Sequence, residues 1–151
     1  MTRIKLVRVF LFLAAVVCLA AGLTAQAPSR SFGTEPGPVV ESFYKIAPGK
    51  TEEWLEIYRT HHLPVLRELE RQGRILSITI YRPVLHQGRP PWDFKVILVW
   101  RDFAAFGDRP HEEGVERKIF SAWLPHREAE RRRWEITEAH WDDLMAVIPA
   151  E

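Results

Sequence analysis

The residues best suited to chemistry in this 151-residue chain lie on one face of a predicted helix. Tyr58 and His62 are four residues apart, and Trp54 stands four residues before Tyr58. Residues at that spacing share a helix face, so an indole, a phenol and an imidazole are predicted side by side. An imidazole in a pocket can act as a general base near neutral pH. We therefore take His62 as a candidate catalytic base, with Tyr58 or Tyr81 orienting a substrate.

Aromatic and polar side chains on neighbouring elements form a second group of candidates. The residues predicted to bind a ligand are Tyr44, Trp54, Trp100 and His140. A pocket between helices and sheet that these residues line would be apolar with a few polar tips, which suits a flat hydrophobic ligand. Ordinary core packing is the alternative for each residue taken singly. The prediction of a pocket therefore depends on these residues lying together and not on any one of them.

The other histidines do not suggest a metal site. His61 and His62 are adjacent, so their side chains point about 100° apart on a helix and cannot chelate one metal ion. His61 is expected to face solvent. His140 with Asp142 or Asp143 is either an oriented acid–base pair or a metal site, or it ends a helix whose dipole a cationic histidine offsets, which we favour. No nucleotide-binding, zinc-protease or serine-hydrolase motif occurs, and no cofactor or metal is predicted.

The elements that would position these side chains follow the order strand, helix, strand, strand, helical region, strand. Alternating β-branched and aromatic residues predict strands, and apolar residues at three- and four-residue spacing predict helices. The expected strands are 39–46, 75–85, 92–101 and 144–148, the first helix is 51–71, and the helical region is 103–140. This α+β order is that of the ferredoxin-like βαββαβ unit, with an extended helical segment before the last strand.

Two features of these elements affect the site and its surroundings. Pro64 should kink the first helix, or split it after His61 and His62, because its ring clashes with the preceding turn. In the third strand, Ile97 and Val99 are apolar on the face opposite the main apolar stripe, so they also need cover. A second copy of the sheet is the simplest cover, which predicts a homodimer.

The charge pattern of residues 126–140 predicts a solvated helix. Its basic and acidic residues alternate at three- and four-residue spacing: Arg131, Arg132 and Arg133 among Glu128, Glu130, Glu135 and Glu138. These interleaved acids argue against a basic patch, and the net charge of the chain is only +1. No nucleic acid or anionic membrane is therefore expected as a partner.

Residues 1–27 are predicted to form a secretory signal peptide, with cleavage after Ala25 or Ala27. A basic start, an apolar centre over residues 9–23 and small residues at the end are typical of this signal. The apolar run is shorter than the ~20 residues that span a bilayer, so no stable anchor is expected, although an uncleaved anchor is the alternative. Cys18 would leave with the signal. Residues 28–37 read as a flexible leader and 38–151 as the domain, exported to the periplasm or the medium.

Five segments of this chain carry a resemblance to a known family: Phe43-Tyr44-Lys45-Ile46, Pro48-Gly49-Lys50, Glu53-Trp54-Leu55, residues 58–65 and Trp92-Asp93-Phe94. They are similar to segments of the dimeric α/β-barrel superfamily. The resemblance covers most of residues 39–148. The superfamily includes antibiotic-biosynthesis-type monooxygenases, which oxidise polycyclic substrates without a cofactor, haem-degrading enzymes, lactone isomerases and NIPSNAP-like proteins. It implies a ferredoxin-like, dimeric α/β barrel. No catalytic motif of the family maps onto this chain residue by residue.

Three functions follow from these observations. The first is an exported protein that binds a small apolar or aromatic molecule between helices and sheet. The second is a cofactor-independent monooxygenase or isomerase that uses His62. The third is a structural or protein-interaction module whose helical segment at 103–140 is the docking surface. A pocket lined by His62 and tyrosines would support the first two, and a filled core would favour the third.

Overall fold

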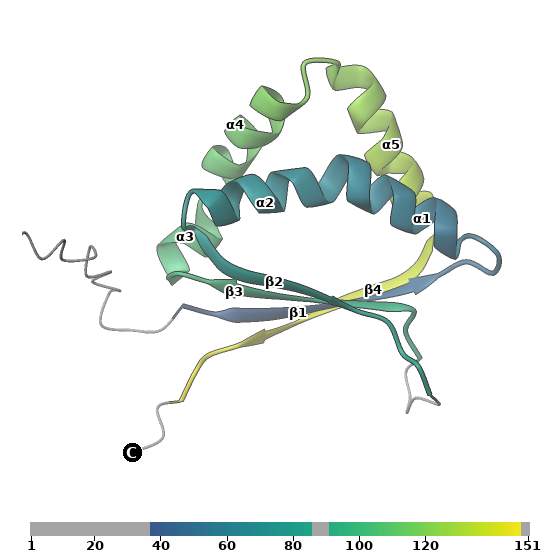
Figure 1. The fold of residues 1–151 in the computed structure, drawn as a ribbon, viewed down its shortest axis with the longest axis horizontal. Coiled ribbons are helices and arrows are strands. Elements are labelled where there is room, and N and C mark those ends of the chain that lie inside the picture. Colours follow the sequence, from purple (N-terminus) through teal and green to yellow (C-terminus); the bar gives the residue numbers. More distant parts are fainter. Residues whose placement is uncertain (1–36, 86–90, 149–151) are drawn as a thin grey trace, which may run out of the picture. The chain divides into compact units, whose positions relative to one another are not determined.

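The structure is a computed structural model, and it describes residues 37–85 and 91–148. Within that part, four strands form one antiparallel sheet in the order β2-β3-β1-β4: β1 (Val39–Ile46), β2 (Ile75–Tyr81), β3 (Phe94–Trp100) and β4 (Thr137–Met145). The helices lie on one side of this sheet (Figure 1). This arrangement confirms the predicted ferredoxin-like α+β fold. The predicted signal peptide and all but the last residue of the predicted leader lie outside the described residues.

The alternation of side chains along β1 and β3 decides which face of the sheet carries the core. Successive residues of a strand point to opposite faces. On the face under the helices, both strands present buried residues: Val40, Ser42, Tyr44 and Ile46 from β1, and Phe94, Val96, Leu98 and Trp100 from β3. The core is therefore a single layer between helices and sheet.

The first helical stretch runs unbroken from Thr51 to Arg71 as α1 (Thr51–Ile57), the π-helical turn η1 (Tyr58–His62) and α2 (Leu63–Arg71). The N–H of Leu63 donates to the carbonyl of Tyr58, five residues back. Pro64 explains this wider turn, because its ring clashes with the carbonyl four residues earlier in a regular α-helix. Gly73, which follows the helix with φ of +70°, ends it as predicted.

The C-terminal half differs from the sequence prediction. Three helices occupy it, α3 (Phe103–Gly107), α4 (Arg109–Ile119) and α5 (Trp123–Glu135), and β4 begins at Thr137. The predicted helix over 126–140 is confirmed as far as Glu135, but residues 137–140 belong to the last strand, which begins at Thr137 and not at residue 144 as predicted. Residues 137–145 pair along the edge of β1, and this tertiary pairing overrides the helical charge pattern.

The second face of the sheet is covered by none of the described helices (Figure 1). We call it the open face. Its central residues alternate with those of the core: Val39, Phe43, Ile97, Val99, Trp141 and Met145. Two of its lysines are paired with acids, with Lys45 Nζ 3.0 Å from Asp93 and Lys95 Nζ 3.4 Å from Glu41.

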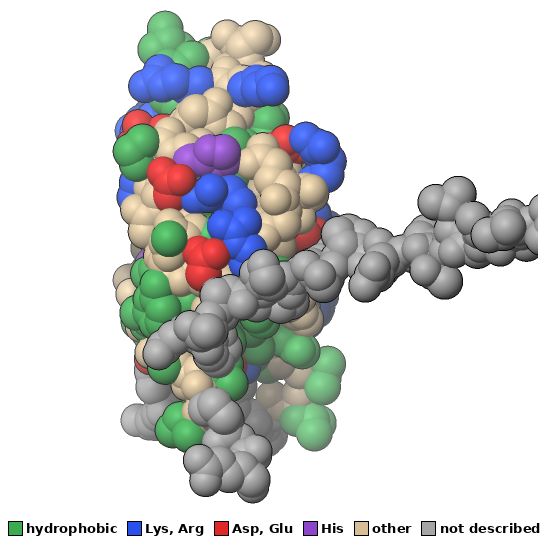
Figure 2. Space-filling view, turned by 90° about the vertical axis from the view of Figure 1, so that its left-hand side faces the viewer, with side chains coloured by type: hydrophobic (Ala, Val, Ile, Leu, Met, Phe, Trp, Pro, Cys, Tyr) green, Lys and Arg blue, Asp and Glu red, His purple; other side chains and the backbone are tan. Residues whose placement is uncertain are grey.

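At the end of the sheet where α3 and α4 lie, acidic and basic side chains are interspersed on the surface (Figure 2). Arg74 is 2.6 Å from Asp108, and Arg109 is 2.7 Å from Glu112. Opposite charges therefore meet in pairs there. Among the described residues, no helix is long and apolar enough to cross a membrane.

Candidate functional site

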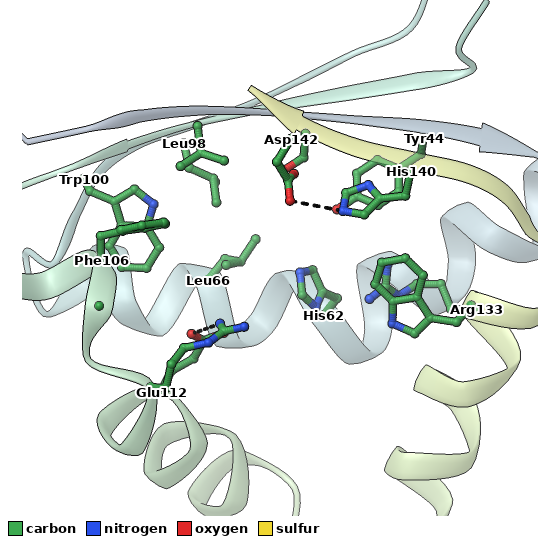
Figure 3. Close-up of a pocket in the computed structure, with 15 residues that line it drawn as sticks. Tyr44, His62, Leu66, Leu98, Trp100, Phe106, Glu112, Arg133, His140 and Asp142 are labelled. Carbon is green, nitrogen blue, oxygen red and sulfur yellow. Dashed lines mark hydrogen bonds and ion pairs between the residues drawn. The ribbon is translucent and has the colours of Figure 1, made fainter. Parts of the chain in front are cut away.

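A pocket of about 430 Å³ lies between the helices and the helix-covered face of the sheet (Figure 3). Strands β1, β3 and β4 form its floor, and η1, α2, α3, α4 and α5 supply the other walls. Apolar side chains dominate the walls, among them Leu66, Leu98, Trp100, Phe106 and Trp134. This volume falls in the range of small-molecule sites, roughly 300–1,000 Å³.

Four of the predicted site residues line this pocket. They are Tyr44 from β1, His62 from η1, Trp100 from β3 and His140 from β4. Residues far apart in the sequence thus converge, because the strand order places β4 beside β1.

The other three predicted residues lie elsewhere. Trp54 and Tyr58 are buried in the core behind the pocket, where their rings stack with centroids 5.0 Å apart. Tyr81 pairs with Lys95 on the open face and is 46% exposed. The expectation that Tyr81 would reach a pocket with His62 is therefore wrong, because Tyr81 follows Ile80, which packs against the core, and successive residues of a strand point to opposite faces.

His62 is held as a neutral imidazole. Its Nδ1 lies 3.7 Å from Oε2 of Glu130. Burial, reinforced by the positive charge of Arg133, lowers the pKa of His62 to about 4. The imidazole is therefore uncharged at neutral pH and is a weak base there.

Burial also keeps the nearby phenols protonated. It raises the pKa of Tyr44 above its ordinary value of 10, although Arg133 opposes the shift. Burial likewise raises the pKa of Tyr58. Both phenols can donate a hydrogen bond, but neither is poised to act as a base at neutral pH.

Arg133 is the functional candidate that sequence reasoning missed. The solvated-helix prediction is wrong for this residue, which is 1% exposed. Its Nη2 donates to Oε2 of Glu130 at 2.7 Å, and its Cζ lies 4.8 Å from the ring centroid of Trp134. The acid three residues earlier is the signal in the sequence, but exposed Arg131 and half-buried Arg132 also have an acid three or four residues earlier. Only packing on the first helical stretch distinguishes Arg133.

His140 lies in β4 and not at a helix end, so the favoured dipole interpretation is wrong. Its Nδ1 donates to the backbone carbonyl of Phe43 at 2.9 Å, and its Nε2 lies 3.3 Å from Oδ2 of Asp142. The ring stacks on Tyr44 at a centroid distance of 4.4 Å. Both ring nitrogens therefore face acceptors, which fixes the orientation of the ring.

A second histidine cluster lies on the other side of the first helical stretch. Nδ1 of His61 is 3.3 Å from Nδ1 of His126, whose Nε2 is 2.6 Å from Oε1 of Glu116. His61 is thus half-buried and not free in solvent as expected, and burial together with His126 lowers its pKa. Within residues 37–85 and 91–148, no group of three or more histidine, cysteine or acidic side chains is arranged to hold a metal ion.

Comparison with solved structures supports the fold. The chain is similar to a dimeric ferredoxin-like protein from an uncultured marine organism (TM-score 0.55, 9% identity, 78% of this chain and 92% of that one). It is also similar to a putative antibiotic biosynthesis monooxygenase from Caulobacter crescentus CB15 (TM-score 0.51, 14% identity, 76% and 92%). An uncharacterized NIPSNAP domain protein from Burkholderia xenovorans matches with a TM-score of 0.45, 17% identity and coverage of 75% and 94%.

No family model and no curated protein matches this sequence. At the identities given above, likeness between structures establishes the fold and leaves the activity open. The predicted resemblance to ferredoxin-like and monooxygenase-like proteins is confirmed at that level.

Proposed function

We propose that this protein binds a small, mostly apolar or aromatic molecule in the pocket between helices and sheet. The observation that carries the proposal is the pocket itself, which has aromatic walls at Tyr44, Trp100 and Trp134. Large apolar walls with a few polar groups are the usual composition of small-molecule sites. A filled core, as the purely structural alternative requires, would leave no such space.

Thermal unfolding of the purified protein with bicyclic aromatic compounds and with haem tests this proposal. A ligand that binds only the folded state raises the melting temperature. Ser42→Leu adds bulk to the pocket from β1, and it should abolish the rise. Ser77→Leu is the matched control, because Ser77 is exposed and pairs with Val99 on the open face. A rise that persists in Ser42→Leu, or no rise with any compound, would contradict the proposal.

An enzyme is the second candidate, a cofactor-independent monooxygenase or isomerase. The observation in its favour is His62, which lines the pocket with the Glu130 carboxylate 3.7 Å from its Nδ1. A carboxylate beside an imidazole can orient the ring and stabilise its protonated form. We rank it second because Tyr58 and Tyr81 lie outside the pocket and the low pKa of His62 makes a weak base. Turnover that disappears in a folded His62→Gln variant would reverse this ranking.

We infer that two copies associate through their open faces. Val39, Ile97, Val99, Trp141 and Met145 would otherwise leave an apolar strip in water. The similar marine protein is described as dimeric. Sedimentation should give a dimer, and Ile97→Lys should give a folded monomer because a lysine would face the partner sheet. Leu124→Lys, an exposed position on α5, should remain dimeric. A monomeric wild-type protein would contradict the inference.

We infer further that the chain is exported, because residues 1–27 have the pattern of a signal peptide. Expression of the full chain in a Gram-negative bacterium, followed by N-terminal sequencing of the periplasmic protein, should give a start at Gln26 or Pro28. A charge in the apolar centre, such as Leu13→Arg, should keep the protein uncleaved. Recovery of an intact N-terminus from the wild-type protein would contradict cleavage.

A further inference from the structure

Two buried hydrogen-bond donors in the pocket walls have no partner among the described residues. They are Nη1 of Arg133 and Nε1 of Trp100. An unpaired buried donor is costly, and such groups are rare in folded proteins. The charged guanidinium carries the larger cost of the two. An acceptor supplied by a ligand would remove that cost.

The guanidinium of Arg133 is fixed in place on its other sides. Nε and Nη2 both face the carboxylate of Glu130, at 3.3 and 2.7 Å. The plane is enclosed by aromatic rings, with Cζ 4.8 Å from the centroid of Trp134 and 5.8 Å from that of Tyr58. Nη1 is thus a donor held in position before any ligand arrives, which reduces the entropic cost of binding.

The two donors lie at opposite ends of one pocket. Figure 3 shows Trp100 beside Phe106 at one end, Arg133 at the other, and His62 between them. Leu66 and Leu98 lie along the stretch between the ends. A ligand in the pocket would therefore meet two leucines and the His62 imidazole in the middle and a hydrogen-bond donor at each end.

The remaining charged groups of the pocket already have partners. Arg109 is 2.7 Å from Glu112, and His140 Nε2 is 3.3 Å from Asp142. His62 is neutral. Of the charged side chains that line the pocket among the described residues, Arg133 is therefore the one with a buried nitrogen that lacks a partner.

Resting on the proposed function, we propose that the ligand of this pocket is a flat apolar molecule carrying an acceptor oxygen, a carboxylate or a carbonyl, that binds Nη1 of Arg133. A carboxylate and a ketone share the chemistry that this donor recognises. They differ in charge, so matched probes distinguish them.

Three naphthalenes with a substituent at the same position test the proposal by calorimetry. They are 2-naphthoate with a carboxylate, 2-acetonaphthone with a carbonyl, and 2-ethylnaphthalene with no acceptor. We expect at least one oxygen-bearing probe to bind roughly tenfold tighter, or more, than 2-ethylnaphthalene. The tighter of the two identifies the kind of oxygen.

A double variant, Glu130→Gln with Arg133→Met, removes the donor without leaving the Glu130 charge buried and unpaired. It should bind all three probes with the affinity of 2-ethylnaphthalene. The control is Glu53→Gln with Arg132→Met, which removes an ion pair of 2.7 Å on the protein surface. The control should keep the wild-type preference, and urea unfolding checks that both variants are folded.

The possible failures are distinct. Equal binding of the three probes to the wild-type protein would overturn the acceptor inference and leave the proposed function intact. A preference for oxygen that survives in the Glu130/Arg133 variant would also overturn it. Binding of none of the probes, nor of any other aromatic compound, would overturn the proposed function as well.

Discussion

The two faces of the sheet are both rich in aromatic residues, yet they differ in whether their charged and polar side chains have partners. On the open face, Lys45 and Lys95 are partly exposed, and each has an acid within 3.4 Å. On the helix-covered face, Arg133 is buried with one nitrogen unpaired, and His62 is half-buried as a neutral ring. Satisfied charges around an apolar strip suit contact with another protein surface. Buried donors with missing acceptors suit a ligand.

The aromatic rings show the same contrast. Phe43 and Trp141 stack on the open face with centroids 5.1 Å apart, where they remain partly accessible. Trp54 on the other side is 0% exposed and stacks on Phe94 at 5.1 Å. One pair is available to a partner, whereas the other holds the domain together.

The largest effect should come from removing Trp54. Trp54→Ala deletes a fully buried indole that also donates to Thr137 at 2.9 Å, and it should lower the free energy of unfolding by about 3–5 kcal/mol. Trp141→Ala on the open face should cost less than half as much. Urea unfolding of both variants measures the difference. Equal losses would mean that the two faces do not differ in this way.

The next largest effect should come from breaking the Arg133–Glu130 pair. Arg133→Met alone leaves the carboxylate of Glu130 buried without its cation, at a cost of about 3 kcal/mol. Adding Glu130→Gln should recover most of this loss, because the buried charge is then gone. A double variant no more stable than the single one would show that the arginine matters through packing alone.

The pH dependence of the free energy of unfolding should show that folding holds His62 in its neutral form. Its pKa falls from an ordinary 6.5 to about 4 on folding, so the unfolded chain binds the proton more readily. Stability is therefore full above pH 6.5 and is lost as the pH falls towards 4. Because part of the ring reaches solvent, we expect a loss on the order of 1–2 kcal/mol over that window.

His62→Gln should flatten this part of the curve. His61 is present in both proteins, so its own depressed pKa cancels in the comparison. Denaturant unfolding at pH 7.5, 6 and 4.5 measures the slope. Identical slopes in the two proteins would show that His62 is not held neutral.

The smallest effect should come from Arg132→Met. Its side chain is 41% exposed, its Nε is 2.7 Å from Glu53, and exposed pairs contribute about 0–1 kcal/mol. Arg132 is the neighbour of Arg133 on the same helix, so this variant sharpens the contrast between a surface pair and a buried one. A loss as large as that of Arg133→Met would remove the contrast.

The sequence predicted the elements whose patterns are local. β1 was expected over the residues it occupies, and the buried face of the first helical stretch follows the spacing of Trp54, Tyr58, Val65 and Leu69. A period of two or of three to four residues is enough to define such a face. The order of elements then fixed the sheet topology.

The sequence did not predict features that depend on packing. Thr137–Met145 has the charges of a helix surface, and only the free edge of β1 makes it a strand. Four site residues were nevertheless predicted, because aromatic rings and imidazoles are chemical types that commonly line ligand sites: Tyr44, His62, Trp100 and His140. Arg133 was missed because its burial depends on how α5 lies against the first helical stretch, which no local pattern records.

The most direct test follows the six tryptophan indole N–H signals by NMR while 2-naphthoate is added. We predict that Trp100 and Trp134, which line the pocket, shift strongly. Trp141, whose ring stacks on Phe43 at the open face, should shift little. Shifts of Trp141 with unchanged Trp100 and Trp134 would place the ligand on the open face and contradict a binding site between helices and sheet.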